Sequence, residues 1–318
     1  MMQRLDAVAG TTQRVTILDG GSCRGTGREL KKIGAPFRQP EWSALSLMEA
    51  PECVTRVHER YIAAGADVIT ANSYAVVPFH IGADRFASDG ERLAALSGQL
   101  ARSAAAAVSS SRHVRVAASL PPVCGSYRSD LFNAAEAAPV LRLLILALVP
   151  FADLWLAETL SAIEEAELVV AELAAAHATA PLWLSFTLAE DGGAEPRLRS
   201  GELVSTAAIA ASRLGAKALL FNCSQPEVMA AAVSVAAVAL SGGGIFDVEI
   251  GCYANAFAPQ TADAEANAGL SELREDVTPA GYRTFAEEWV SRGATIVGGC
   301  CGIGPEHIAY LTASKAPE

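Results

Sequence analysis

The sequence predicts an α/β fold, a single-domain (β/α)8 barrel that spans residues 1–318. Short apolar runs alternate with amphipathic stretches along the chain, a pattern typical of parallel strands that helices cover on the outside. The alternation repeats eight times, the number of strand and helix pairs that closes a barrel within roughly 250 to 300 residues. A doubly wound open sheet is the alternative, although Gly25 and Gly27 lack the third glycine of the nucleotide-binding fingerprint.

The elements are predicted in chain order. An apolar strand at 15–19 comes first, and apolar residues at helical spacing predict a helix over 50–64 that Gly65 ends. Further strands are predicted at 67–71, 114–120, 154–158, 182–188, 218–221 and 248–253, with a last strand that begins at 295. Further helices are predicted near 90–110, 135–149, 161–176, 202–213, 226–240 and 279–292, with a last helix that begins at 305.

The longer connections follow the third, fifth and seventh predicted strands, at 121–134, 189–201 and 256–278. All three leave the carboxyl ends of their strands, and barrel active sites lie on that face because its loops converge over the barrel mouth. These segments are therefore the candidate lid and specificity loops.

Composition and charge restrict the class of protein. With 51% hydrophobic and 19% charged residues, the chain can bury a large core. The net charge of −11 and the absence of a basic run argue against binding nucleic acid or an anionic membrane surface. A cationic or zwitterionic small molecule fits this charge better.

Seven cysteines without a signal peptide indicate a reducing compartment, so we expect a cytoplasmic protein with free thiols. The uncharged stretch 228–246 is rich in alanine and ends in Ser-Gly-Gly-Gly. It therefore predicts a buried helix and a loop, and not a membrane span.

Three cysteines stand at the ends of two predicted strands. Cys300 and Cys301 are adjacent and cannot easily form a disulfide with each other, and Cys223 ends another strand of the same predicted sheet. Three thiolates with an open fourth position describe a catalytic zinc site. Buried structural cysteines are the alternative, because free cysteine is often buried without a function.

Polar residues end three other predicted strands. Glu158 ends an apolar run, where a carboxylate is costly unless it is paired or belongs to a site. Asp19 is followed by two glycines, a pattern that can hold a ligand amine beside exposed backbone N–H groups. Plain turns are the alternative for the Asp19 segment. The residues that these strand ends contribute are Asp19, Gly20, Gly21, Asn72, Ser73 and Glu158.

These motifs resemble the homocysteine S-methyltransferase family, and the resemblance covers nearly the whole chain. The matching segments are 19–21, 65–74, 222–223 and 298–302. The resemblance implies a Zn²⁺ ion held by Cys223, Cys300 and Cys301, with the sulfur of L-homocysteine as an exchangeable fourth ligand. It also implies that Asp19 and Glu158 hold the homocysteine ammonium, and that the Gly20-Gly21 backbone and the Asn72-Ser73 turn line the amino-acid end of the pocket.

The implied activity is transfer of a methyl group from a small onium donor to homocysteine, giving methionine. Betaine enzymes of the family place a tyrosine after the strand-four glutamate, where this chain has Thr159. S-methylmethionine is therefore the favoured donor, followed by S-adenosylmethionine. A betaine donor remains the alternative, with a partial aromatic cage built from Trp42, Tyr74 and Tyr127.

A further alternative is a zinc or homocysteine-binding barrel without turnover. The two carboxylates argue against it, because a purely structural zinc site has no use for them. The five histidines are interpreted as structural. We expect a monomer or a small homo-oligomer.

Overall fold

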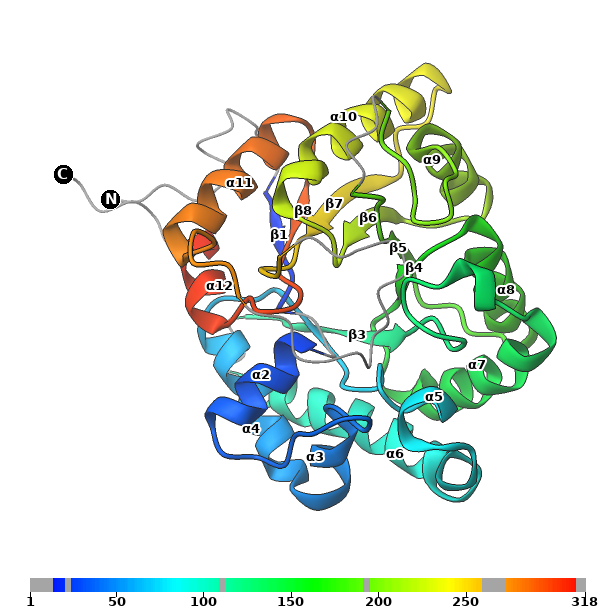
Figure 1. Ribbon diagram of the computed structural model, residues 1–318, viewed down its shortest axis with the longest axis vertical. Coiled ribbons are helices and arrows are strands. Elements are labelled where there is room, and N and C mark those ends of the chain that lie inside the picture. The colour runs from blue at the N-terminus through cyan, green and yellow to red at the C-terminus, as the bar shows by residue number, and fades with distance from the viewer. Residues whose placement is uncertain (1–13, 21–23, 109–111, 191–194, 259–272, 313–318) are drawn as a thin grey trace.

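The protein, described here as a computed structural model, is a barrel of parallel strands inside a ring of helices (Figure 1). The structure describes residues 14–20, 24–108, 112–190, 195–258 and 273–312. The strands are β1 (Thr16–Ile17), β2 (Val68–Thr70), β3 (Arg115–Leu120), β4 (Leu154–Leu160), β5 (Leu182–Phe186), β6 (Ala218–Asn222), β7 (Glu249–Tyr253) and β8 (Ile296–Val297).

The sheet closes on itself. Its order is β1-β8-β7-β6-β5-β4-β3-β2, and every paired neighbour is parallel. The seam between β1 and β2 is completed by a parallel bridge between Leu18 and Val68. At this seam the backbone N–H of Asp19 donates to the carbonyl of Val68 at 3.0 Å, and that of Asp67 donates to Ile17 at 2.7 Å. The predicted (β/α)8 barrel is confirmed, and the open doubly wound sheet is wrong.

The eight predicted helices are present: α4 (Pro51–Ala63), α6 (Ala83–Ala106), α7 (Ala134–Leu148), α8 (Ile163–Ala175), α9 (Val204–Arg213), α10 (Pro226–Gly242), α11 (Pro279–Ser291) and α12 (Pro305–Thr312). Three more lie in connections where no helix was predicted: α2 (Arg24–Lys32), α3 (Ala44–Glu49) and α5 (Pro78–Ile81). All three follow β1 or β2 on the carboxyl side, so they build the rim of the barrel mouth.

The two shortest strands lie at the ends of the chain's strand sequence. β1 and β8 each have two residues, because the chain after them turns into the site while it keeps sheet-like hydrogen bonds. The backbone N–H of Gly299 donates to Asp19 at 2.9 Å, and that of Cys300 donates to Ala254 at 2.9 Å. The apolar run thus continues past the strand and carries the cysteines to the barrel mouth.

The buried side chains form two clusters. The larger one lies between the strands and the helices. The smaller one fills the barrel and includes Leu154, Leu156 and Leu220 as well as the three cysteines of the predicted site. Because side chains alternate along a strand, Leu154 and Leu156 place the next residue of that face, Glu158, inside the barrel. The barrel interior is therefore apolar below and becomes polar at its carboxyl end.

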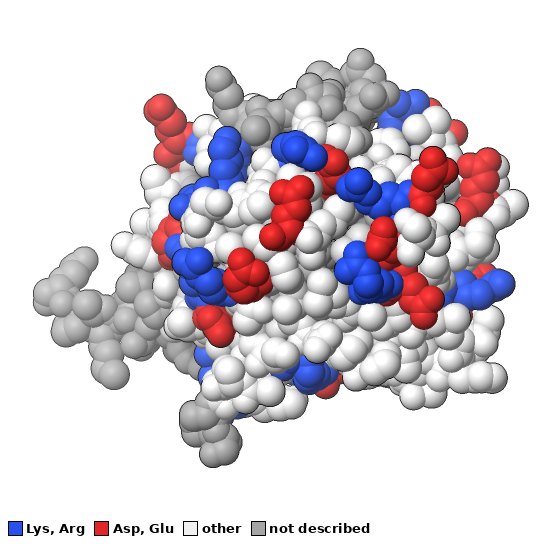
Figure 2. Space-filling view, turned by 90° about the horizontal axis from the view of Figure 1, so that it is seen from below, with Lys and Arg blue, Asp and Glu red and all other residues white. Residues whose placement is uncertain are grey.

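The surface carries both signs of charge, interspersed over the face in Figure 2. In the described part of the chain, one segment is long and apolar enough to cross a membrane, Ala134–Phe151, which is α7 and the turn after it. In the fold it packs beside α6 and α8 and against β3. Most of the uncharged stretch 228–246 lies in α10, in agreement with the helix predicted there.

Candidate metal and substrate site

Three thiols meet at the carboxyl end of the barrel. Cys223 follows β6, Cys300 and Cys301 follow β8, and all three are buried. The Sγ atoms lie within 4.8 Å of one another, with 3.6 Å between Cys223 and Cys301 and 3.8 Å between Cys300 and Cys301. Sulfur ligands about 2.3 Å from a tetrahedral zinc lie about 3.8 Å apart, and these two spacings match that value. Among the described residues, no other group of histidine, cysteine and acidic side chains meets this standard.

The neighbouring thiols disfavour ionisation of Cys300. The pKa of Cys300 lies well above its usual value, because its sulfur shares hydrogen bonds with Cys223 and Cys301 and is buried. A bound divalent cation reverses this effect, since it stabilises the thiolate form outright. The cluster is therefore a set of soft ligands whose charge a metal would balance.

Tyr127 contacts the thiol cluster from the connection after β3. Its hydroxyl lies 2.8 Å from the Sγ of Cys223, and the guanidinium carbon of Arg199 lies 5.2 Å from the centroid of its ring. Tyr127 and Cys223 both have left-handed backbones, with φ of 69° and 54°. Two of the predicted specificity loops, those after β3 and β5, thus supply side chains to the site.

Asn222 ties the thiol cluster to β4. Its Oδ1 accepts from the backbone N–H of Thr159 at 3.0 Å and from the hydroxyl of Ser185 at 2.7 Å. Its Nδ2 donates to Oγ1 of Thr159 at 2.8 Å. Thr159 has a φ of 62°, and the β4–β5 register shifts between Ala157 and Leu160. One buried amide therefore fixes both the bulge beside Glu158 and the residue before Cys223.

Glu158 is held inside the barrel by two hydroxyls. Ser119 donates to its Oε1, and Tyr253 donates to its Oε2 at 3.3 Å. Burial raises the pKa of Tyr253 well above its usual value, so this phenol stays protonated and remains a donor. The carboxylate is thus oriented before any ligand arrives.

Asp19 lies at the end of β1 and also serves the barrel seam. Its Oδ2 accepts from the backbone N–H of Thr70 at 2.7 Å, and its Oδ1 accepts from the Thr70 hydroxyl at 2.9 Å. These bonds link β1 to β2, where the backbone ladder is short. Asp19 therefore has a structural role that the sequence did not indicate.

The remaining predicted site residues follow the first two strands: Gly20 and Gly21 come after Asp19, and Asn72 and Ser73 come after β2. Gly20 must be glycine, because a Cβ there would lie 2.1 Å from the Tyr61 hydroxyl. Gly21 lies outside the described residues. Asn72 is fully buried; its Nδ2 donates to Ser43 at 3.1 Å, and its Oδ1 has no protein partner. Ser73 donates to the carbonyl of Ser119 at 2.8 Å.

The three aromatic residues of the hypothetical betaine cage come from the connections after three different strands, β1, β2 and β3. Trp42 packs edge-on against Phe37 in the cluster outside the barrel, and Tyr127 belongs to the cluster inside it. The Tyr74 hydroxyl is 2.6 Å from that of Ser126. Of these residues, Tyr127 reaches the thiols through its hydroxyl.

Histidines do not enter the thiol cluster. His307 anchors the turn after β8, since its Nδ1 accepts from the backbone N–H of Gly304 at 3.2 Å. Burial lowers its pKa, and full burial lowers the pKa of His58 on α4 to about 4.

Sequence reasoning missed Tyr253, Ser119 and Thr70 as parts of the site. Each is the last or next-to-last residue of its strand, on the face where the predicted barrel has its mouth. That position was a usable signal for Tyr253, which pairs in register with Asn222. The contacts between their side chains and the two carboxylates depend on strand stagger, which the sequence does not specify.

Comparison with known proteins finds matches over nearly the full length. The family described as homocysteine S-methyltransferase matches residues 16–314. The homocysteine S-methyltransferase of Escherichia coli (strain K12) is 30% identical over 315 residues, covering 95% of this chain and 95% of that protein. Homocysteine S-methyltransferase 3 of Arabidopsis thaliana is 27% identical over 337 residues, covering 95% and 90%. The crystal structure of the homocysteine methyltransferase MmuM from Escherichia coli, metallated form, has a TM-score of 0.71 at 27% identity, covering 96% of this chain and 98% of that one.

Proposed function

This chain belongs to the homocysteine S-methyltransferase family, and from that premise we propose that it methylates the thiol of L-homocysteine to give methionine, with an onium compound as donor and zinc as cofactor. The observation that carries the proposal is the meeting of three buried Sγ atoms within 4.8 Å at the mouth of the barrel. A methyl transfer to sulfur needs a thiolate acceptor, and this cluster is where one would be generated.

Cys223, Cys300 and Cys301 would hold the zinc. Three thiolates with an open fourth position suit a catalytic zinc better than a harder cation, which prefers oxygen ligands. When bound, zinc would supply a deprotonated homocysteine sulfur at neutral pH, where a free thiol with a pKa of about 8.5 is mostly protonated.

The chain's own carboxylates would bind the acceptor. Glu158 and Asp19 carry negative charge at the carboxyl ends of β4 and β1, where the ammonium of an amino acid can be held. The hydroxyls of Ser119 and Tyr253 fix the orientation of the Glu158 carboxylate. The hydrogen bonds from Thr70 fix that of the Asp19 carboxylate. Gly20, Gly21, Asn72 and Ser73 would line the same end, with Oδ1 of Asn72 as an acceptor that the protein leaves without a partner.

The transfer itself balances without a general base. The homocysteine sulfur forms a bond to the methyl carbon as the bond from that carbon to the donor's onium atom breaks, and the electron pair leaves with the neutral donor product. No proton moves in this step, which agrees with the absence of histidine from the thiol cluster.

S-methylmethionine is the donor that we favour, with S-adenosylmethionine second and betaine as the alternative. The Thr159 side chain offers no ring face, and Asn222 holds it in place. The Tyr127 ring already has the Arg199 guanidinium 5.2 Å from its centroid, so a quaternary ammonium on that face would meet a like charge. The neutral thioether that a sulfonium donor releases is also a better leaving group than the tertiary amine that betaine releases.

A donor panel tests this function. Zinc-loaded protein is incubated with homocysteine and each donor, and methionine is measured. We expect S-methylmethionine to give a kcat/KM at least about ten-fold above that of betaine, a ratio that corresponds to about 1.4 kcal/mol of transition-state binding. Equal turnover with betaine would overturn the donor assignment, and no methionine with any donor would overturn the function.

We further propose a reducing, cytoplasmic setting, because all six described cysteines are free thiols. We also propose that the protein acts as a monomer or a small homo-oligomer.

A further inference from the structure

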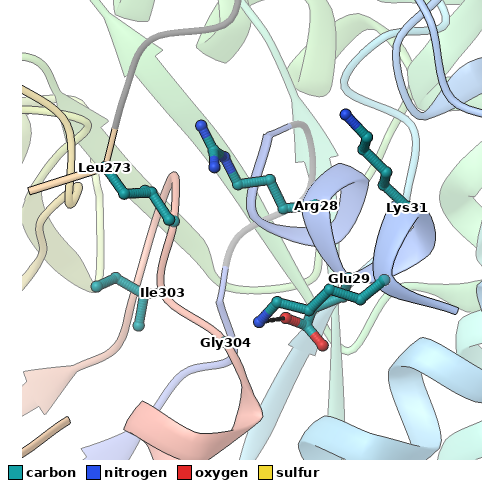
Figure 3. Close-up of a pocket in the computed structure, with 8 residues that line it drawn as sticks. Arg28, Glu29, Lys31, Leu273, Ile303 and Gly304 are labelled. Atoms are coloured by element: carbon teal, nitrogen blue, oxygen red, sulfur yellow. Dashed lines mark ion pairs between the residues drawn. The ribbon is translucent and has the colours of Figure 1, made fainter. Parts of the chain in front are cut away.

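We propose that a pocket at the rim of the barrel mouth binds the carboxylate of the methyl donor, which makes the donor a zwitterionic onium carboxylate that lies with its onium end at the thiols. The pocket has a volume of about 260 Å³ and lies between α2 and the turn after β8 (Figure 3). Its lining includes Arg28, Lys31 and Lys32 on one side and Leu273 and the Gly302–Gly304 turn on the other. This inference rests on the proposed function, because it assigns one end of that reaction's donor.

The pocket belongs to the same face of the barrel as the thiols. Its walls come from the connections after β1, β7 and β8, which are neighbouring strands in the sheet. Gly302 follows Cys301 directly, and the carbonyl of Cys301 accepts from the backbone N–H of Ala256 at 2.7 Å. A ligand in the pocket therefore lies beside the thiol cluster along the rim.

One aromatic ring separates Arg28 from the thiols. The guanidinium carbon of Arg28 lies 5.0 Å from the ring centroid of Phe257, and Phe257 packs in the same buried cluster as Cys300 and Cys301. In Figure 3 the Arg28 side chain extends toward Leu273, away from Glu29. We infer that a donor of amino-acid size reaches from this guanidinium to the thiols, because Gly302 of the pocket lining follows Cys301 directly.

The charges favour an anion in the pocket. Three lining side chains are cationic and one, Glu29, is acidic, and Lys32 also pairs with Glu306 at 2.9 Å, so the formal sum of these five groups is +1 (3 − 2). Glu29 is buried, and its charge is compensated within the fold by Lys32 at 2.6 Å and Arg60 at 2.9 Å. The thiolates attract the onium group, whereas these cations repel it and attract a carboxylate. A zwitterionic donor would therefore bind with its onium group at the thiolates and its carboxylate in the pocket.

The wall opposite α2 is rigid. Tyr61 donates to the carbonyl of Ile303 at 2.9 Å, His307 accepts from the N–H of Gly304, and Gly302 takes a left-handed φ of 85°. A fixed wall lowers the ordering cost of binding, because the pocket need not be assembled around its ligand.

The test compares S-methylmethionine with S-methylmethioninamide, which has a neutral amide in place of the carboxylate. For the wild-type protein with zinc and homocysteine, we expect a KM for the amide at least about ten-fold higher. Arg28→Met keeps the apolar stem and removes the charge. This variant should raise the KM for S-methylmethionine about ten-fold and leave the KM for the amide within about two-fold, so the difference between the two donors should disappear. Arg92→Met, at an exposed arginine of α6, is the matched control and should retain the difference between the two KM values.

Three outcomes would overturn the proposal: equal KM values for the two donors in the wild type, unchanged discrimination in Arg28→Met, or a rise in the KM for homocysteine in place of the donor. The last would assign the pocket to the acceptor's carboxylate. These outcomes differ from failure of the proposed function, which is the absence of methionine with every donor.

Calorimetric binding of the two sulfonium compounds to the zinc-loaded protein, without homocysteine, tests the pocket independently of turnover. We expect tighter binding of the carboxylate form by at least about ten-fold, and equal affinities would overturn the assignment.

Discussion

The site has a thiol side, made of the three cysteines, and a carboxylate side, made of Glu158 and Asp19. The two sides differ in whether the protein itself provides the partners of these groups. Cys223, Cys300 and Cys301 lie 3.6 to 3.8 Å apart in the closest pairs, and the other two thiols disfavour ionisation of Cys300. Glu158 and Asp19, in contrast, each accept two hydrogen bonds from hydroxyl or backbone donors. The proposed metal would complete the thiol side, whereas the carboxylate side is formed by the fold.

This difference separates metal binding from substrate binding. Removing a thiol should remove the metal and leave the barrel intact, because no strand pairing depends on it. Changing Glu158 should affect the substrate and leave the metal in place. Asp19 combines both functions, since its bonds to Thr70 also hold the β1–β2 seam. Asn222 is the direct link between the two sides.

The largest effect is expected for Cys223→Ala. Two thiolates rarely hold a catalytic zinc tightly, so we expect the zinc content to fall from about one per chain to less than about a tenth, with loss of methionine formation. Metal analysis after dialysis measures it. Cys53→Ala, at a buried cysteine of α4 outside the cluster, is the matched control and should retain zinc. Full zinc content in Cys223→Ala would remove this residue from the metal site.

Glu158→Gln should affect the acceptor alone. The loss of a charge-assisted hydrogen bond to an ammonium costs roughly 1.5–3 kcal/mol, so the KM for homocysteine should rise about ten- to a hundred-fold. The zinc content should not change. Steady-state kinetics and metal analysis of the same preparation measure both, and unchanged kinetics would leave Glu158 with a structural role only.

Asn222→Ala should lower both the stability of the segment beside Glu158 and the affinity for zinc. Each effect should be smaller than those of the two variants above. It leaves the N–H of Thr159 and the hydroxyl of Ser185 without their partner, at a cost of about 1–3 kcal/mol for each buried group. Because the same residue precedes Cys223, zinc affinity should fall about ten-fold, the lower range for residues that orient metal ligands. Chemical denaturation and competition with a chelator measure the two effects.

Ser185→Ala is the control for that variant, because it removes one of the three bonds and leaves Thr159 held. It should keep zinc affinity within about two-fold. Equal loss of zinc affinity in both variants would mean that Asn222 acts through general stability and not by positioning Cys223.

The barrel was predictable from the sequence because its signal is repeated. Eight apolar runs, separated by helical spacing, determine the topology even where single boundaries shift, as at β1 and β8. The cysteines were predictable for a related reason: Cys223 and Cys300 end apolar runs, and the ends of parallel strands meet on one face.

What the sequence did not indicate depends on side-chain contacts between distant segments. The hydroxyl of Tyr127 reaches Cys223 across 96 positions, and that of Tyr253 reaches Glu158 across 95. Tyr127 was interpreted as a ring for a cation, because composition reveals an aromatic residue but not which of its atoms faces the site. The rim helix α2 and its pocket were also missed, because the first connection has no apolar periodicity that marks a helix.

The central claim is that three protein thiolates hold a zinc whose fourth position exchanges for the substrate sulfur. X-ray absorption at the zinc edge tests it most directly, since it counts the sulfur atoms around the metal. For the zinc-loaded protein we expect three sulfur neighbours at about 2.3 Å and one lighter atom, and four sulfur neighbours after homocysteine is added. A sulfur count that stays the same when homocysteine binds would contradict the account.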